Sequence, residues 1–163
     1  MNMKKLIFIF AITGMAYAAS GQKADTSYWT RKGVSGINLS QTGFKDWSAG
    51  GDNSIAFDLY LNYDANYKKD KHLWDNRLEL AYGLNKTETN GTRKTNDKRY
   101  LSSQYGYQIA PKWYLSALLT YQTQFAEGYD YGVSDSDYIS KFMAPGYLTI
   151  GPGITWIPND WFK

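Results

Sequence analysis

Apolar and polar side chains alternate along residues 54–67 almost without interruption. Because successive side chains of a β-strand point to opposite faces, this alternation predicts a strand with one apolar and one polar face. A polar turn at residues 68–71 follows, and the alternation then resumes as far as residue 85. The two segments together predict a long antiparallel hairpin whose apolar face carries Leu59, Leu61, Leu78 and Leu80.

Similar alternation predicts four more strands, over residues 31–42, 98–109, 113–125 and 144–156, and the beginning of another at 161–163. The polar stretches 41–53, 86–97 and 126–141 are interpreted as long loops. The connections 68–71, 110–112 and 157–160 are short. Short turns on one rim and long loops on the other are typical of outer-membrane barrels.

Aromatic side chains stand beside every short turn: Tyr67, Trp74, Tyr107, Trp113, Trp156 and Trp161. A ring of Trp and Tyr at one level is typical of the girdle at a membrane interface. We therefore expect an all-β fold, an antiparallel up-and-down transmembrane β-barrel. Six to seven strands are visible in residues 31–163, whereas a closed bacterial barrel has an even number of at least eight. The barrel is expected to be incomplete.

A soluble lipocalin-like barrel, apolar inside and polar outside, is the alternative fold. Its solvent face should be rich in Lys and Glu, but the polar faces here carry mainly Tyr, Ser, Gln, Asn and Gly. An Arg77 side chain in mid-membrane lipid would cost about 2–4 kcal/mol, so we expect it to face the lumen. The charged residues of the polar faces then predict a lumen charge cluster of Asp58, Asp64, Asp75, Arg77 and Glu79.

The first 18 residues have the pattern of a secretory signal peptide. Lys4 and Lys5 precede an apolar run over residues 6–16, and residues 16–18 form an A-x-A cleavage site. The apolar run is shorter than the roughly 20 residues that a membrane helix needs. We expect export, followed by a polar N-terminal segment at residues 19–30.

The absence of cysteine excludes disulfides and thiol chemistry. Without the signal peptide, 16 basic and 15 acidic side chains remain, so we expect no attraction to nucleic acid. The only histidine, His72, lies at a short turn, away from the long loops. We therefore expect neither a catalytic site nor a metal or other cofactor held by His or Cys.

Two features of the long loops suggest contacts. Asp130, Asp135 and Asp137 offer carboxylates for Ca²⁺, but they lack the spacing and the glycine of a calcium loop, so a solvated loop is the preferred interpretation. Trp47 is a candidate contact for a ligand or a partner, although packing onto the outer interface of the barrel is the preferred interpretation.

Five short motifs carry a family resemblance: residues 46–54, 93–98, 112–114, 124–126 and 141–148. Together they resemble a Bacteroidetes outer-membrane barrel family, catalogued as domain of unknown function 3078. The resemblance implies a barrel in the outer membrane of a Gram-negative bacterium, in contact with outer-membrane lipid, and it implies no reaction. Family members continue beyond this length, so we expect an N-terminal portion.

Two roles follow as hypotheses from this combination of pattern and resemblance. The first is a pore or transport component. The second is a non-conducting structural or accessory subunit of an outer-membrane complex, which would contact envelope proteins through its long loops.

Overall fold

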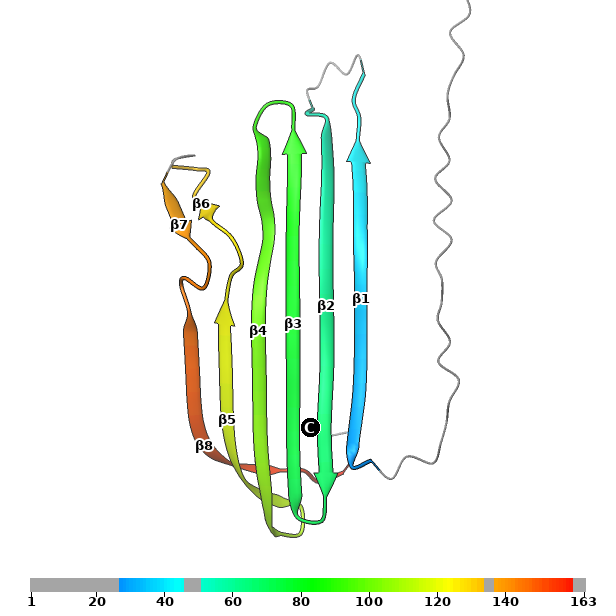
Figure 1. The fold of residues 1–163 in the computed structure, drawn as a ribbon, viewed down its shortest axis with the longest axis vertical. Helices are drawn as coiled ribbons and strands as arrows, with labels where there is room; N and C mark the ends of the chain where they lie inside the picture. The colour runs from blue at the N-terminus through cyan, green and yellow to red at the C-terminus, as the bar shows by residue number, and fades with distance from the viewer. Residues whose placement is uncertain (1–26, 46–50, 134–136, 160–163) are drawn as a thin grey trace, which may run out of the picture.

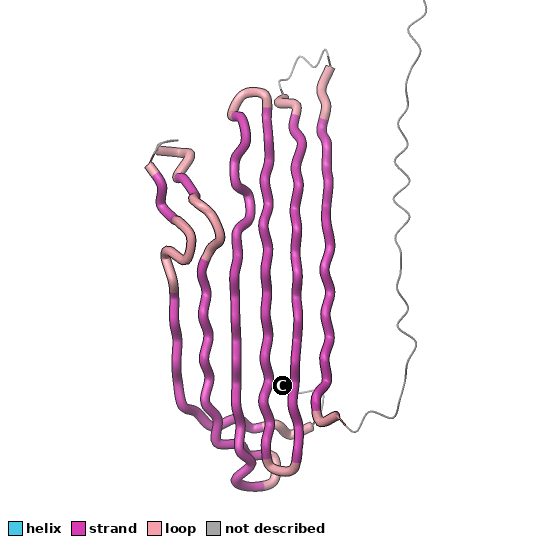
Figure 2. Tube along the Cα trace, in the orientation of Figure 1, coloured by secondary structure: helices cyan, strands magenta, loops and turns pink. Residues whose placement is uncertain are grey.

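The computed structural model describes residues 27–45, 51–133 and 137–159, and six long strands in these residues form one antiparallel sheet (Figure 1). Its strand order is β1 (Trp29–Thr42), β2 (Ser54–Lys69), β3 (His72–Thr87), β4 (Gly91–Ala110), β5 (Trp113–Thr123) and β8 (Tyr147–Trp156). Two short strands, β6 (Gly128–Tyr129) and β7 (Tyr138–Ser140), pair separately. Throughout the described chain there is no helix, and hence none long and apolar enough to cross a bilayer (Figure 2).

The register of the sheet keeps the predicted apolar face continuous from β1 to β8. Leu78, Leu101 and Tyr121 stand opposite one another on β3, β4 and β5, and Tyr121 stands opposite Leu148 on β8. On the other side, Ile37 of β1 stands opposite Leu59 of β2. Because a slip of one residue would exchange the two faces, this register confirms the predicted alternation and the antiparallel all-β class.

The apolar face is the more exposed face of the sheet. Leu101, Tyr105 and Leu115 are exposed by 41%, 41% and 55%, whereas the polar-face residues between them on β4 and β5 are buried or half-buried. In Figure 1 the lower ends of β5 and β8 sweep across the view toward the lower end of β1, so the sheet is curved. Side chains spread apart on a convex surface and crowd together on a concave one. The polar face is therefore the concave face.

A contact between strands that are not neighbours agrees with this curvature. The Gln104 Nε2 of β4 donates a hydrogen bond of 3.0 Å to Thr155 Oγ1 of β8, across β5. Ser116 of β5 also reaches Thr155, with 2.9 Å between the hydroxyl oxygens. No hydrophobic side chain among the described residues is buried, so the sheet encloses no apolar core.

Aromatic rings line the lower end of the sheet, where the short turns lie. The Trp29 ring centroid is 5.2 Å from that of Tyr67 and 5.7 Å from that of Trp74. At the other edge, the centroids of Trp113 and Trp156 are 6.2 Å apart. The predicted aromatic row is observed at this rim, except for Trp161, which lies outside the described residues.

The predicted long loop at residues 86–97 is wrong. Strand β3 continues to Thr87 and β4 already begins at Gly91, so only residues 88–90 connect them. Thr92 and Arg93 pair with Lys86 and Asn85 through the backbone. Hydrophobic alternation cannot reveal this part of the hairpin, because both of its faces are polar. The regular alternation of long and short connections therefore fails between β3 and β4.

Other boundaries also differ from the sequence prediction. Strand β1 already begins at Trp29, within the predicted polar segment 19–30, and β5 ends at Thr123 instead of residue 125. The turn at residues 68–71 is tighter, because Lys68 and Lys69 belong to β2 and only residues 70–71 lie between the strands. The polar stretch at 126–141 contains the small hairpin of β6 and β7, and the last strand begins at Tyr147 instead of residue 144. Short strands with few apolar residues carry little periodic signal.

A β-bulge interrupts the pairing of β3 and β4. Gly83 stands opposite Asn96 and Leu84 opposite Lys94, so Thr95 is the extra residue. Gly83 is buried, and a Cβ atom there would collide with the Asp58 carboxylate and lie 2.8 Å from Thr95 Oγ1. A side chain at this position would therefore have to displace the side chains of Asp58 and Thr95.

We predict that Gly83→Ala destabilises the sheet by about 1–3 kcal/mol, the usual cost of overpacking a filled site. Gly151→Ala is the matched control, because nothing lies within 4 Å of the Cβ position there. Urea unfolding of the refolded protein, followed by tryptophan fluorescence, measures both. Equal midpoints for the two variants would contradict the packing at the bulge.

Candidate functional site

Charged side chains meet on the polar, concave face near the middle of β2, β3 and β4. Arg77 Nε lies 2.9 Å from Asp64 Oδ1, and Lys98 Nζ lies 2.5 Å from Glu79 Oε2. Asp75 shares this face two residues from Arg77. The structure thus brings together Asp64, Asp75, Arg77 and Glu79 from the predicted lumen charge cluster.

Asp58 is set apart from these four residues. It stands opposite Gly83, six residues along β3 from Arg77, which corresponds to roughly 20 Å along a strand. Lys98, in contrast, was missing from the predicted cluster, although it lies on the same face as Tyr100. Its position two residues before Tyr100, on a strand of known alternation, was the signal that could have identified it.

The two ion pairs of this cluster are partly open to solvent. The side chains of Arg77 and Asp64 are 59% and 35% exposed, and those of Lys98 and Glu79 are 42% and 26% exposed. Exposed pairs contribute about 0–1 kcal/mol each. Their main effect is on the local field, since fixed charges of both signs line a hollow of about 580 Å³ on this face.

A second polar cluster lies at the upper end of β4 and is nearly closed to solvent. Lys94 Nζ lies 2.6 Å from Asp97 Oδ2, and the two side chains are 11% and 3% exposed. Residues three apart on a regular strand point to opposite faces, but the bulge at Thr95 turns Lys94 to the face of Asp97. The bulge is therefore what makes this ion pair geometrically feasible.

The Lys94–Asp97 pair holds the chain that follows β5. The Asp97 carboxylate accepts hydrogen bonds from the backbone N–H groups of Phe125 and Ala126, at 2.7 and 3.0 Å. Lys94 Nζ donates to Gln124 Oε1 at 3.2 Å and to the Ala126 carbonyl oxygen at 2.9 Å. Two of the resembling motifs, residues 93–98 and 124–126, thus meet at one anchor.

The electrostatics of this anchor favour the ionised carboxylate. Burial by itself raises the pKa of Asp97, but the hydrogen bonds from Lys94, Phe125 and Ala126 outweigh it, so the pKa lies below its ordinary value. Asp97 lies nearer the upper end of β4 than Leu101, the last apolar side chain in that direction. Asp97 therefore stays ionised at neutral pH and keeps the loop attached.

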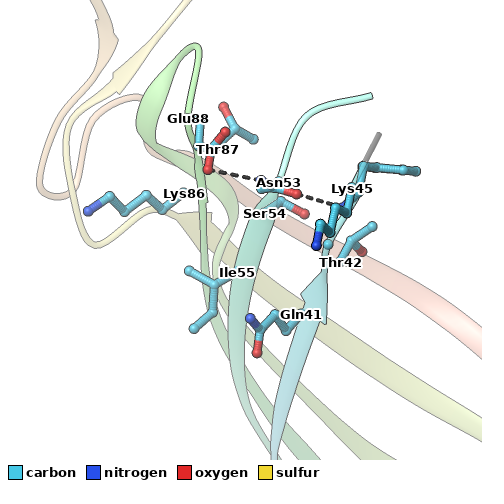
Figure 3. A pocket seen from close by; sticks show the side chains of 11 residues that line it. Gln41, Thr42, Lys45, Asn53, Ser54, Ile55, Lys86, Thr87 and Glu88 are labelled. Carbon is cyan, nitrogen blue, oxygen red and sulfur yellow. Dashed lines mark hydrogen bonds between the residues drawn. The ribbon is translucent and has the colours of Figure 1, made fainter. Parts of the chain in front are cut away.

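A third cluster ties the first long loop to the β3–β4 turn. Asn53 Oδ1 accepts a hydrogen bond from the Phe44 backbone N–H at 2.6 Å, and Asn53 Nδ2 donates to Glu88 Oε1 at 2.9 Å (Figure 3). The Asp52 carboxylate accepts a hydrogen bond from the Thr89 backbone N–H at 3.1 Å. Desolvation raises the pKa of Asp52, but the hydrogen bonds that its carboxylate accepts from Thr87, Glu88 and Thr89 outweigh this effect. The pKa of Asp52 therefore lies below its ordinary value.

These contacts frame an open pocket of about 680 Å³ at the upper end of β1, β2 and β3. Lys45, Lys86 and Glu88 carry its charged groups (Figure 3). The pocket combines both signs of charge with amide and hydroxyl groups, and it opens to solvent. Such a surface suits contacts with a polar partner more than the enclosure of a small ligand.

Two of the remaining candidates from the sequence, His72 and Asp130, make local contacts. His72 Nδ1 lies 2.6 Å from the Tyr105 hydroxyl, within the aromatic row of the lower rim. Asp130 accepts a hydrogen bond from the Gly132 backbone N–H at 3.1 Å, and so stabilises its own turn. Trp47 and Asp135 lie outside the described residues. Within the described ranges, no group of three or more His, Cys, Asp or Glu residues is placed to hold a metal ion.

Comparison with known protein families matches residues 39–129 to the family described as Protein of unknown function (DUF3078). This region includes all of β2, β3, β4 and β5 and more than half of the chain. No curated protein and no solved structure matches the chain.

We predict that Asp97→Asn loosens the chain after β5, because a neutral amide loses the ion pair with Lys94 and half of its acceptor capacity. Hydrogen exchange at the amides of Phe125 and Ala126, corrected for intrinsic rates, should become at least tenfold faster. Asp70→Asn at the lower turn is the matched control and should leave these amides protected.

The same anchor should also respond to acid. Since the pKa of Asp97 is lowered in the folded protein, its contribution to stability is present above the unfolded pKa of about 3.9 and is lost as pH falls through the folded value. Protection of the two amides should therefore decrease below about pH 4 in the wild type and stay low at every pH in Asp97→Asn. A pH-independent wild type would contradict the role of the carboxylate.

Proposed function

Because the chain belongs to the family described as Protein of unknown function (DUF3078), which has no assigned activity, we propose a role from the geometry of the sheet. We propose a non-catalytic β-barrel of the outer membrane of a Gram-negative bacterium, with the apolar face toward lipid and the polar face toward the lumen. Export through residues 1–18 and an origin in the Bacteroidetes belong to the same proposal, supported by the signal-peptide pattern and the resembling motifs.

The curvature of the sheet is the observation that carries this proposal. A soluble lipocalin-like barrel needs its apolar face on the concave side, where it lines the interior. Here the apolar side chains are spread on the convex side, and residues such as Ile150 and Ile154 are exposed by 68% and 64%. In water this arrangement would expose a large contiguous apolar surface, which monomeric soluble proteins rarely do. A lipid environment removes that cost.

The edges of the sheet set a further requirement on the proposal. Each of β1 and β8 has one strand neighbour in the described sheet. Unpaired backbone groups in lipid cost several kcal/mol each. We therefore propose that further strands, from the same chain or from a neighbouring subunit, close the barrel.

Within this frame, the preferred role is a pore or transport component. The lumen would carry the ion pairs Arg77–Asp64 and Lys98–Glu79, which leave charges of both signs facing the passage. A second role, a non-conducting accessory subunit, is favoured by the anchored upper loops. The contacts of Asp52, Asn53 and Asp97 hold these segments in one geometry, as a protein-binding surface requires.

We predict that Leu78→Arg blocks membrane assembly, because a lipid-facing Arg at the midplane costs about 2–4 kcal/mol. Thr120→Arg, on the polar face of β5, is the matched control and should assemble. Recovery in the outer-membrane fraction and faster gel migration without boiling measure assembly. Normal assembly of Leu78→Arg together with failure of Thr120→Arg would reverse the assignment of the faces.

We further predict that Arg77→Gln shifts the ion selectivity of the reconstituted protein toward cations, because one positive charge leaves the lumen. Reversal potentials in planar bilayers under a salt gradient measure the shift, with Lys69→Gln near the lower turn as control. Assembled wild-type protein that gives no conductance would exclude the pore and leave the accessory role.

A further inference from the structure

An apolar groove of about 570 Å³ lies on the convex, apolar face of the sheet. Its floor and wall include Leu59, Leu61, Leu80, Tyr82, Phe125 and Ala126. The floor residues come from β2 and β3, and the wall residues come from the segment that follows β5. The groove exists because this segment leans over the outward face, and its volume is within the range of ligand sites, roughly 300–1,000 Å³.

The wall of the groove is fixed in place. The backbone N–H groups of Phe125 and Ala126 donate to the buried carboxylate of Asp97, which stands opposite Tyr82 in the register. Asp97 is paired in turn with Lys94. The segment that forms the wall is therefore fixed to the folded sheet, and the groove needs no rearrangement before it can bind a ligand.

A cation without a carboxylate partner lies at the edge of this groove. Arg99 stands opposite Leu80 in the register, and its guanidinium carbon lies 4.9 Å from the ring centroid of Phe125 and 5.5 Å from that of Phe142. Arg77, Lys94 and Lys98 each pair with a carboxylate. Arg99 forms no such pair within the part of the chain that the structure describes. Its contacts there are aromatic.

The position of Arg99 relative to the apolar face matters as well. On the outward side of β4, the apolar residues end at Leu101, Arg99 follows, and the polar end of the strand lies beyond. Phe142, whose ring touches Arg99, is 64% exposed, and Tyr147 is also 64% exposed. Arginine and exposed aromatic rings at the boundary of an apolar band are the groups that meet the headgroup region of a bilayer.

We propose that this groove binds one membrane lipid with a phosphate headgroup. The guanidinium of Arg99 would bind the phosphate through paired N–H donors, and an acyl chain would lie in the groove between Leu80 and Phe125. The inference rests on the proposed function, because only a membrane barrel presents this face to lipid. It adds a specific lipid site to a surface that otherwise contacts lipid in general.

Native mass spectrometry of the full-length protein, released from micelles that contain phosphatidylglycerol, tests this site. The wild type should retain one phosphatidylglycerol, and Arg99→Gln should bind it at least tenfold more weakly, since a charge-assisted hydrogen-bond pair is lost. Ala126→Leu should also bind more weakly, because its side chain fills the groove while the backbone contact to Asp97 remains. Lys69→Gln removes a cation stacked on Tyr28 at the opposite rim and should bind like the wild type.

Two ligand controls separate the parts of the site. A diacylglycerol with the same acyl chains lacks the phosphate, and inorganic phosphate lacks the chains, so both should be retained far less than phosphatidylglycerol. Equal retention of phosphatidylglycerol by the wild type, Arg99→Gln and Ala126→Leu, all assembled in membranes, would overturn the lipid site and leave the barrel proposal intact. Failure of the wild type to assemble in membranes would overturn both.

Discussion

A sheet with one apolar and one polar face must cover its apolar side, and the curvature decides how. In this protein the apolar side chains of the six-stranded sheet lie on its convex face, and no hydrophobic residue among those described is buried. A soluble barrel would curve the other way and fill its interior with these side chains. The proposal of a lipid environment around the sheet rests on the sign of this curvature, together with a register that keeps the two faces distinct.

The polar residues divide into two groups with different tasks. The concave face carries two partly solvent-exposed ion pairs, Arg77–Asp64 and Lys98–Glu79. These pairs affect the local electrostatic field more than the stability of the fold. At the upper end, the pair of Lys94 and Asp97 is almost closed to solvent and fixes the segment after β5 by backbone hydrogen bonds. That anchor also builds the wall of the outward groove, so the loop and the proposed lipid site depend on the same carboxylate.

The alternation of apolar and polar residues was sufficient to predict the six long strands, their antiparallel order and their two faces, because each strand needs an apolar side at fixed spacing. The alternation was insufficient where a strand has no apolar side. Residues 86–97 are paired through the backbone although both faces are polar, and β6 and β7 are too short to show a period. The observed charge cluster contains Lys98 and does not contain Asp58, because the register of the strands determines which residues meet. The Lys94–Asp97 anchor depends on the bulge at Thr95, which a period of two does not predict.

The orientation of the two faces can be measured directly, because the chain contains no cysteine. Single cysteines at positions 74–82 of β3, each carrying a nitroxide label in reconstituted membranes, report accessibility to oxygen in lipid and to a polar nickel complex in water. We expect accessibility to vary with a period of two: oxygen accessibility is highest at positions 76, 78, 80 and 82, and nickel accessibility is highest at 75, 77, 79 and 81. The opposite phase, or water accessibility at every position, would contradict a lipid-facing convex surface.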